Sequence, residues 1–187
     1  MADLTKLPLW MSGGCVHVVV ETPRLARVKL AYDPDLECFV MSRALMLGLA
    51  YPYDWGFLPS TLGEDGDPLD VLIMHDAETS PGLVLRCHIA GALKVVQTAE
   101  GRTVRNDRFI AVPDHDHRAK ILVDARDLPK AVRSEIKQFF VASVATEDKE
   151  LKFLGWAGPK EAMKLIKDGE KALIEQSDTI DSGLTPG

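Results

Sequence analysis

The 187-residue sequence has only three cysteines and no apolar run long enough to cross a bilayer. Cys15, Cys38 and Cys87 are odd in number and far apart, so they fit neither a disulfide framework nor a zinc-binding motif. We expect buried free thiols in a reducing compartment. Residues 1–12 lack the basic start and apolar stretch of a signal peptide. The sequence therefore predicts a cytoplasmic protein with no membrane partner.

A block of lysine and arginine is also missing. The formal net charge is −6, and acidic and basic side chains are interspersed along the chain. Proteins that bind nucleic acid through its phosphates usually carry a basic patch. Interleaved aromatic and basic residues, which single-strand binders use as stacking platforms, are absent as well. We therefore expect no nucleic-acid partner, and a nucleic-acid-binding barrel is the weakest of the functions considered.

The length and the 46% content of apolar residues fit one domain with one sizeable core. The sequence shows no internal repeat and no linker between domains. We expect an N-terminal extension over residues 1–15, a single domain over 16–175, and a flexible polar tail over 176–187.

The first half of the chain predicts strands. Residues 16–21 (VHVVVE) are rich in β-branched side chains, and residues 27–32 (RVKLAY) alternate basic and apolar side chains. Residues 37–41 follow a Asp33-Pro34-Asp35 turn, which predicts a hairpin with the preceding strand. Further strands are expected at 69–74, 83–96 and 108–112.

The second half predicts helices. Asp127 can cap a helix that begins near Pro129, because apolar residues repeat at helical spacing after it, at Val132, Ile136, Phe139 and Phe140. A second helix is expected from Gly158-Pro159 to about Leu173. Strands followed by helices indicate an α+β fold. We predict a small closed barrel of about five strands with the helices packed outside.

Three carboxylates crowd one short segment, in which Asp65, Asp67 and Asp70 come directly before an apolar run. Such carboxylates repel one another unless a cation neutralises them. Gly66 and Pro68 shape the loop tightly, which suits the ordered oxygen ligands that Mg²⁺ requires. The segment predicts a Mg²⁺ site, with Mn²⁺ as the alternative ion.

The same loop suggests two other interpretations, an EF-hand and a solvated acidic turn. An EF-hand fails, because Asp70 stands where that loop needs its invariant glycine. A solvated acidic turn stays open. Against it, Asp70 lies at the mouth of an apolar run, where an unpaired buried carboxylate is costly.

Several other residues each allow two interpretations. Lys29 lies within one strand and Arg43 ends the next, so the two cations suit either a bound anion or salt bridges. Tyr51 belongs to an aromatic loop (AYPYDWGF), which is typical of a small core as well as of a ligand site. The stretch 114–117 (DHDH) alternates aspartate and histidine, which fits metal ligands or a solvated loop.

The segment GEDGDPLDVLIM, residues 63–74, is close to the signature D-[SGDN]-D-[PE]-[LIVMF]-D-[LIVMGAC], and by it the chain resembles the soluble family I inorganic pyrophosphatases. The segments VVVETP, YPYDWGFLPSTL, RCHIAGALKVV and FIAVP follow that family in order, so the resemblance spans about residues 16–170. It implies an OB-like five-stranded antiparallel β-barrel with flanking C-terminal helices. It also implies Mg²⁺-dependent hydrolysis of inorganic diphosphate to two phosphates by metal-activated water, and a homo-oligomer.

By motif position, the resemblance also implies roles for individual residues. Asp67 would be the general base, and Asp65 and Asp70 would be metal ligands. Glu21 would be a further acid that lines the site. The groups that contact phosphate would be Lys29, Arg43 and Tyr51.

The sequence departs from the family pattern within the site. Acids of the family are replaced by Ala31, Gln97 and Asn106, and a Tyr-Lys pair is replaced by Ser143-Val144, for which Lys149 or Lys152 could compensate. Asp107 is a candidate replacement metal ligand, although neighbours on a strand point to opposite faces and a bulge would be needed. Arg108 keeps a cation for the substrate, as a planar fork rather than a point charge.

These observations predict an inorganic diphosphatase in which the acid loop is intact and the opposing half of the site is thinned. Two alternatives stay open. One is a weakened or retuned homologue that binds or hydrolyses another phosphoanhydride. The other is a non-catalytic phosphate-binding protein. Retention of Asp67 favours an enzyme, because a protein without catalysis has no need of the base.

Overall fold

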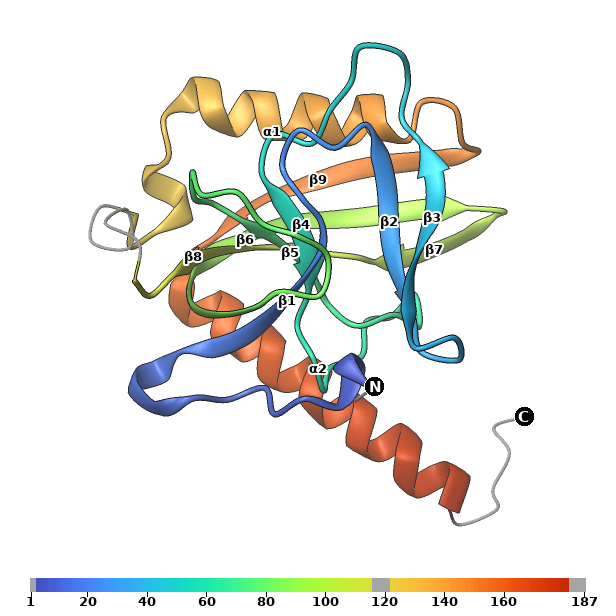
Figure 1. Cartoon of the computed structure of the whole chain (residues 1–187), viewed down its shortest axis with the longest axis vertical. Coiled ribbons are helices and arrows are strands. Elements are labelled where there is room, and N and C mark those ends of the chain that lie inside the picture. The colour runs from blue at the N-terminus through green and yellow to red at the C-terminus, as the bar shows by residue number, and fades with distance from the viewer. Residues whose placement is uncertain (1–2, 116–121, 182–187) are drawn as a thin grey trace.

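The computed structural model describes residues 3–115 and 122–181, and its centre is a closed ring of five strands (Figure 1). The strands pair in the order β1-β4-β5-β8-β6, and β6 pairs with β1 to close the ring. The ring strands are β1 (Val16–Thr22), β4 (Asp54–Phe57), β5 (Asp70–Ile73), β6 (Val84–Ala99) and β8 (Arg108–Pro113). This arrangement confirms the OB-like barrel with two C-terminal helices.

One pair of ring strands differs from the prediction, because β5 and β8 run parallel rather than antiparallel. The strand β6 carries the chain back along the barrel after β5, and β8 is antiparallel to β6. The strand β8 therefore runs in the same direction as β5. Apolar periodicity locates strands but does not fix the direction in which they pair.

Three strands were not expected from the sequence, namely β4, β7 (Arg102–Arg105) and β9 (Lys149–Ala157). The strand β4 has only four residues and contains a glycine, while β7 is half arginine. The strand β9 pairs along the second half of β6 and has three exposed charged residues near its start, at Lys149, Glu150 and Lys152. The expected hairpin is present as β2 (Val28–Asp33) and β3 (Cys38–Ala44), which form a separate two-stranded sheet.

Two helices cover opposite sides of the barrel (Figure 1). The helix α1 (Lys130–Ser143) begins after Pro129, as predicted, but Pro129 itself is the N-cap, and Asp127 belongs to a preceding 3₁₀ turn (Ala125–Asp127). The helix α2 (Pro159–Asp181) continues past Leu173. No helix among the described residues is long and apolar enough to cross a membrane.

The expected flexible tail over 176–187 is wrong for its first part, because residues 176–181 continue α2. Ser177 and Thr179 each donate their hydroxyl to a carbonyl one turn earlier, at 3.0 and 2.7 Å. The composition is polar, but no glycine or proline occurs between Gly169 and Gly183. Residues 182–187 lie outside the described part of the chain.

The N-terminal segment packs on the domain through two short 3₁₀ turns, Leu4–Lys6 and Ser12–Gly14. Leu9 packs in the core inside the barrel. The indole of Trp10 donates to the carboxylate of Glu170 in α2 at 2.8 Å. Cys15 and Cys87 are buried free thiols, as expected, whereas Cys38 is exposed on the β2–β3 hairpin. The apolar residues of β3 do not reveal from the sequence that one face of this strand, which carries Cys38, is exposed to solvent.

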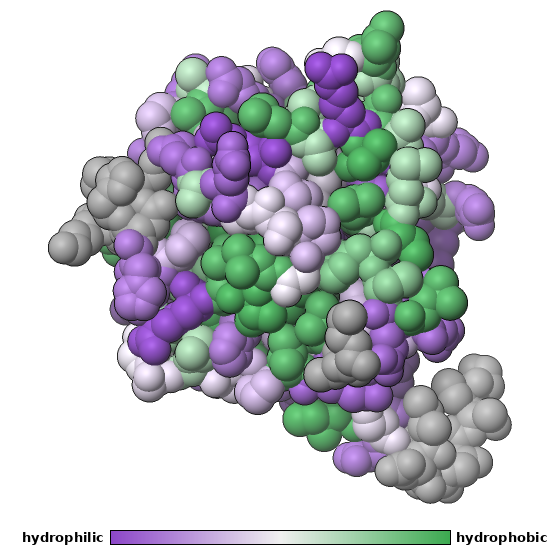
Figure 2. Space-filling model, in the orientation of Figure 1, coloured by the Kyte–Doolittle hydropathy of each residue, from purple (hydrophilic) through white to green (hydrophobic). Residues whose placement is uncertain are grey.

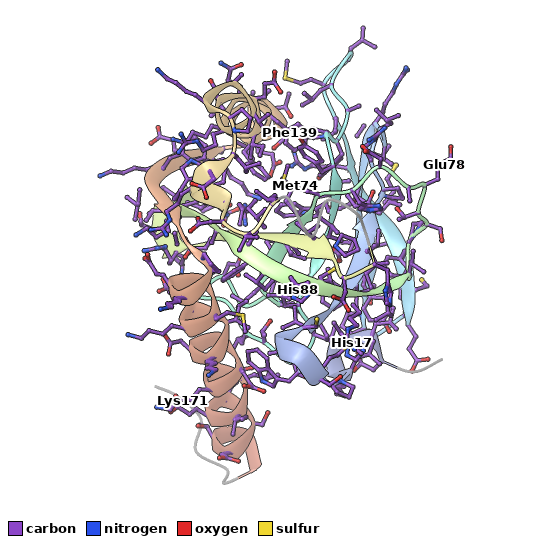
Figure 3. The ribbon with its side chains drawn as sticks, turned by 90° about the vertical axis from the view of Figure 1, so that its left-hand side faces the viewer. His17, Met74, Glu78, His88, Phe139 and Lys171 are labelled. Atoms are coloured by element: carbon purple, nitrogen blue, oxygen red, sulfur yellow. The ribbon has the colours of Figure 1, made fainter. Side chains whose placement is uncertain are left out.

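Alternation along the strands separates two cores. Val71 and Ile73 of β5 pack in the barrel core with α2, while Leu72 and Met74 pack against α1. Figure 3 shows Met74 beneath Phe139, on the side of the sheet that α1 covers. The strand β8 alternates in the same way, with Phe109 and Ala111 in the barrel core and Ile110 and Val112 under α1. Even-numbered positions of both strands therefore face α1.

A glycine in β6 allows this packing. Gly91 has φ +152°, and a Cβ atom there would lie 2.3 Å from the carbonyl oxygen of Ala157 and 2.8 Å from the Cβ of Ala125. The register of β6 against β8 shifts at this residue. The strands β6 and β9 approach closely here because no side chain stands between them.

We expect Gly91→Ala to lower the free energy of unfolding by about 2–4 kcal/mol, because overpacking and backbone strain add. Gly101→Ala is the matched control. Its φ is also positive, at +77°, but nothing lies within 4 Å of the added atom. This control should lose only ~1 kcal/mol. Urea unfolding measures both, and equal losses would show that the close approach at Gly91 has no energetic weight.

Candidate active site

The site is built around a contact between β5 and β8. Val71 pairs with Phe109, so the preceding residues, Asp70 and Arg108, lie side by side on the face toward α1. Arg108 Nη1 contacts Oδ2 of Asp70 and Oδ1 of Asn106. Arg108 is only 6% exposed. The parallel register therefore places a buried cation against the last acid of the motif.

Aromatic rings enclose this guanidinium. Its central carbon lies 5.2 Å from the centroid of Trp55 and 5.6 Å from that of Phe140. Both distances fit cation–π contacts, which are worth about 0.5–2 kcal/mol. Trp55 of β4 and Phe140 of α1 thus hold Arg108 in place. Trp55 belongs to the aromatic loop that was expected to form either a small core or a ligand site, whereas helical spacing marked Phe140 only as a core residue.

The acid loop is held by its own hydrogen bonds. The amide of Gly63 donates to the carbonyl of Asp67 at 2.8 Å, and Gly66 turns the chain with φ +92°. Asn106 Nδ2 donates to Oδ2 of Asp65 at 2.5 Å. The loop therefore presents its carboxylates from a fixed backbone, next to the start of β8.

Seven of the predicted residues line one cavity of about 240 Å³. Asp65, Asp67 and Asp70 supply the carboxylates of its wall. The cations and the phenol that line it are Lys29, Arg43 and Tyr51, and Arg108 lines it as well. The structure thus brings together the acid loop and the hairpin cations, which are distant in sequence.

The hairpin places its two cations opposite each other, since Lys29 of β2 pairs with Arg43 of β3. Arg43 contacts the carbonyl of Ser143 and the carboxylate of Glu147, after the end of α1. Glu147 also accepts from Lys149 at 2.7 Å. Lys149 lines the cavity and Lys152 does not, so Lys149 is the one of the two lysines that is placed to compensate for the missing Tyr-Lys pair. Glu147 was missed, because one acid in a polar loop gives no sequence signal.

The structure does not bring Asp107 to this cavity. Its carboxylate accepts from the amide of Val95 at 2.8 Å and from Nε of Arg105 at 2.5 Å, and the residue is buried. Asp107 has the parity of Phe109 rather than that of Arg108, so it lies on the other face of the strand, where it lines a separate cavity of about 310 Å³ that Asp65 also borders. Its contacts tie the start of β8 to β6.

Glu21 borders a second cavity of about 590 Å³, which shares Lys29, Asp67 and Asp70 with the first. Ala31 lines this larger cavity. The Glu21 carboxylate accepts from the amide of Tyr32 at 2.8 Å. Burial raises the pKa of Glu21 to about 7, and the neighbouring charges of Asp70 and Asp67 add to the effect.

Two carboxylates of the loop, those of Asp65 and Asp67, are also hard to ionise. Burial, followed by repulsion from Asp70 and Asp67, raises the pKa of Asp65 to about 6. Burial and Asp70 raise the pKa of Asp67, which Lys29 partly opposes. Crowded, partly desolvated oxygen ligands of this kind would be relieved by a bound cation. Asp65, Asp67 and Asp70 are thus the residues that could hold a divalent metal ion.

Tyr51 fits both of its interpretations. Its ring lies 5.0 Å from that of Phe139, within the core under α1, while the residue also lines the smaller cavity. Burial raises the pKa of its phenol. The hydroxyl therefore stays protonated and is a hydrogen-bond donor at neutral pH.

Comparison with known proteins gives a consistent result. The family model described as "Inorganic pyrophosphatase" matches residues 18–173. The inorganic pyrophosphatase of Thermus thermophilus is 36% identical over 171 residues, covering 89% of this chain and 95% of that protein. The inorganic pyrophosphatase of Synechocystis is 32% identical over 166 residues, covering 89% of this chain and 96% of that protein.

Solved structures agree with these matches. The crystal structure of the Thermus thermophilus inorganic pyrophosphatase superposes with a TM-score of 0.84 at 35% identity, covering 92% of this chain and 99% of that chain. The Helicobacter pylori inorganic pyrophosphatase gives a TM-score of 0.80 at 29% identity, with 90% and 98% coverage. The chain belongs to the inorganic pyrophosphatase family.

Proposed function

We propose that this protein hydrolyses inorganic diphosphate to two phosphates in a Mg²⁺-dependent reaction. The observation that carries the proposal is the pairing of an acidic wall with basic groups around one 240 Å³ cavity. Asp65, Asp67 and Asp70 form the wall, and Lys29 and Arg43 come from the hairpin. A multiply charged anion needs cations around it, and the acids need a metal ion to approach that anion.

The donor set fits Mg²⁺, because all three loop ligands are carboxylate oxygens, the type that this hard ion selects. Mn²⁺ takes the same ligands. Asp65 and Asp70 would hold the ion. When bound, it would neutralise phosphate charge and lower the pKa of a water nucleophile towards about 7. Asp107 would not hold a metal ion, since its carboxylate already accepts hydrogen bonds from Val95 and Arg105.

Asp67 is the proposed general base. It lines both cavities, and its raised pKa makes it a better proton acceptor than an ordinary aspartate. Lys29 partly opposes that rise in pKa, which favours the ionised form of Asp67. Asp67 would therefore accept the proton of the attacking water and hold it at a carboxylate oxygen.

The cations would bind the phosphates. Lys29, Arg43 and the phenol of Tyr51 line the cavity opposite the acid loop, and Lys149 extends this set. Donors placed where charge develops stabilise the leaving phosphate. Arg108 has a double role, because it would contact phosphate from the cavity wall while its contact with Asp70 orients that carboxylate.

The larger cavity favours a second candidate function, hydrolysis of another phosphoanhydride. Ala31 replaces a family acid there, and about 590 Å³ adjoin the acid loop. An organic group on one phosphate would find room beside Phe57 and Leu173. Phosphate release from diphosphate, compared with release from nucleoside diphosphates and triphosphates, tests this candidate. Release from none of them with Mg²⁺ would favour a non-catalytic phosphate-binding protein.

We also propose a cytoplasmic homo-oligomer. Free thiols at Cys15, Cys38 and Cys87 suit a reducing compartment. Figure 2 shows hydrophobic side chains at the loop that follows β3, where Met46 and Leu47 are exposed. With Met41 on β3, these residues form an apolar surface that a second copy of the chain could cover. A solution mass equal to that of one 20.6 kDa chain would refute the oligomer.

We expect Asp67→Asn to lower the rate of phosphate release by about 10²–10⁴-fold, because the amide keeps the shape but cannot accept a proton. Mg²⁺ binding should largely survive. Glu64→Gln is the matched control, since Glu64 belongs to the same loop but does not line the 240 Å³ cavity. Steady-state kinetics at saturating Mg²⁺ measures both. A rate unaffected by Asp67→Asn would mean that another group is the base.

The replaced acids predict a looser second metal ion. The double variant Ala31→Glu/Asn106→Asp restores two carboxylates next to the loop, so it should reach half-maximal activity at a lower Mg²⁺ concentration than the wild type. Ala31→Gln is the neutral control, which adds the same bulk without charge. Phosphate release against Mg²⁺ concentration gives the result. The same shift in the neutral control would assign the effect to shape instead of charge.

Mg²⁺ affinity should also depend on pH. The pKa of Asp65 is about 6 without metal, and that of Glu21 is about 7. A carboxyl must lose its proton before it can bind the ion. The Mg²⁺ affinity should therefore be full above about pH 7. Below about pH 6 it should fall by about tenfold per pH unit for each carboxyl that has to lose a proton. Calorimetric Mg²⁺ titrations at several pH values measure this. Asp65→Asn should bind more weakly with a flatter pH profile. A wild-type affinity constant down to pH about 5 would contradict the assignment.

A further inference from the structure

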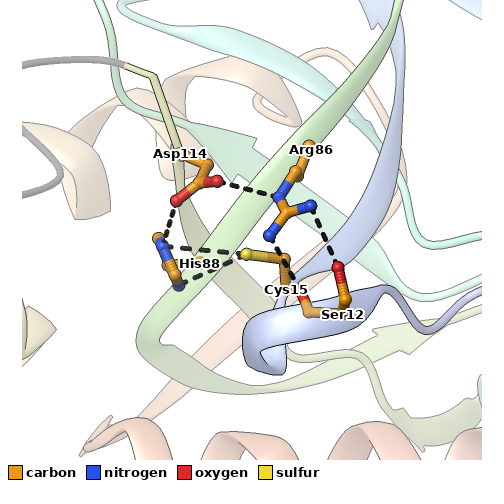
Figure 4. Close-up of polar contacts among 5 residues, drawn as sticks. All are labelled: Ser12, Cys15, Arg86, His88 and Asp114. Atoms are coloured by element: carbon orange, nitrogen blue, oxygen red, sulfur yellow. Dashed lines mark hydrogen bonds and ion pairs between the residues drawn. The ribbon is translucent and has the colours of Figure 1, made fainter.

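A second cluster of metal-ligand side chains lies away from the acid loop (Figure 4). Cys15, His88 and Asp114 each offer one ligand atom, and these atoms all lie within 4.8 Å of one another. Cys15 Sγ lies 3.6 Å from Nδ1 and 3.7 Å from Nε2 of His88. Nε2 of His88 lies 2.6 Å from Oδ1 of Asp114. No other such group of three occurs in residues 3–115 and 122–181.

This cluster occupies the opposite end of the barrel from the proposed active site. Cys15 precedes β1, whereas Glu21 lies near the end of that strand. Asp114 follows β8, whereas Arg108 begins it. Six residues of strand separate the members of each pair, which corresponds to about 20 Å. The cluster therefore cannot share a metal ion with the acid loop.

The donor set selects a different kind of ion from that of the acid loop. One sulfur, one imidazole nitrogen and one carboxylate oxygen match the ligands of Zn²⁺, which binds Cys, His and Asp at about 2.0–2.3 Å. Mg²⁺ uses oxygen ligands and has little affinity for a thiol. Three protein ligands leave a fourth position for water, as in zinc sites that keep one open position.

Arg86 supports the three ligands from the next layer. Its Nε lies 2.8 Å from Oδ2 of Asp114, which leaves Oδ1 facing His88. Its other nitrogens donate to Ser12, to the carbonyl at 2.9 Å and to the hydroxyl at 3.3 Å. This anchors the segment that carries Cys15. Partners of this kind orient metal ligands in known sites.

Access to the cluster is one-sided. The Cys15 residue is fully buried, whereas the side chains of His88 and Asp114 are 44% and 23% exposed. An ion can arrive from solvent on the side of His88 and reach the sulfur behind it. An ion pair between His88 and Asp114 would explain two of the residues, but it gives no reason for a sulfur atom against the imidazole.

We propose that Cys15, His88 and Asp114 form a zinc site that clamps β1, β6 and β8 at the end of the barrel remote from the acid loop. No zinc motif marks it in the sequence, because 73 residues separate Cys15 from His88 and 26 separate His88 from Asp114. Bound zinc stabilises the folded state, since the unfolded chain does not bring these segments together.

Co²⁺ is the probe for this site, used with the full-length protein under reducing conditions. One equivalent should give a thiolate-to-Co²⁺ charge-transfer band, which oxygen ligands alone cannot produce, and Zn²⁺ should abolish it. Cys15→Ser should lose the band, whereas the control Cys38→Ser, which changes an exposed cysteine on the hairpin, should keep it. No band in the wild type, or a band that survives Cys15→Ser, overturns the proposal.

His88→Gln covers the case in which the buried Cys15 variant does not fold, because His88 is partly exposed. It should weaken Co²⁺ binding and lose the rise in melting temperature that Zn²⁺ gives the wild type. His17→Gln is its control, a half-buried histidine of β1 outside the cluster that should keep both effects. Arg86→Gln should weaken binding by about 10–100-fold. Equal Zn²⁺ stabilisation of wild type and His88→Gln would overturn the site. None of these measurements depends on diphosphate hydrolysis.

Discussion

Arg108 and Asp70 meet because β5 and β8 run parallel and in register, and the other groups of the proposed active site are arranged around this contact. The guanidinium is buried between Trp55 and Phe140, so it needs an anion beside it. Removing one partner of a buried ion pair typically costs about 3–5 kcal/mol. Asp70 is thereby fixed at the mouth of β5, and the loop that ends at Asp70 is fixed with it.

Burial and repulsion between carboxylates disfavour the ionised forms of the acids around this contact. Burial raises the pKa of Glu21 to about 7 from an ordinary value near 4.5, so the folded state binds a proton more tightly than the unfolded chain. Stability from this group is therefore full at low pH and is lost as the pH rises from about 4.5 to 7. The acids weaken the metal-free fold at neutral pH, and the same repulsion favours binding of a cation.

The sequence predicted the barrel because apolar periodicity marks its long strands. It predicted a metal site at the acid loop because three aspartates in six residues repel one another unless a cation neutralises them. It missed β4 and β9, whose residues read as an aromatic loop and a polar stretch until β5 and β6 supply partners. Asp107 could not be placed from the sequence, since its orientation depends on the register at the start of β8. The Cys15 cluster was invisible for the same reason, because only the closed barrel unites its three segments. Within the 114–117 stretch, Asp116 and His117 lie outside the described residues.

Two of the departures from the family pattern, Asn106 and Arg108, contact each other. Asn106 donates to Asp65 through its amide nitrogen and contacts Arg108 through its amide oxygen, so one neutral side chain bridges an acid and a cation. An aspartate at this position could satisfy Arg108 but would repel Asp65. Nη1 of Arg108 contacts Asp70 and Asn106 together, while its guanidinium group lies against the rings of Trp55 and Phe140. Asn106 and Arg108 therefore assemble the acid loop by hydrogen bonds and ion pairs, where additional carboxylates would need a second metal ion to do so. A site assembled in this way is better ordered without metal, and it gains less from each ion that binds.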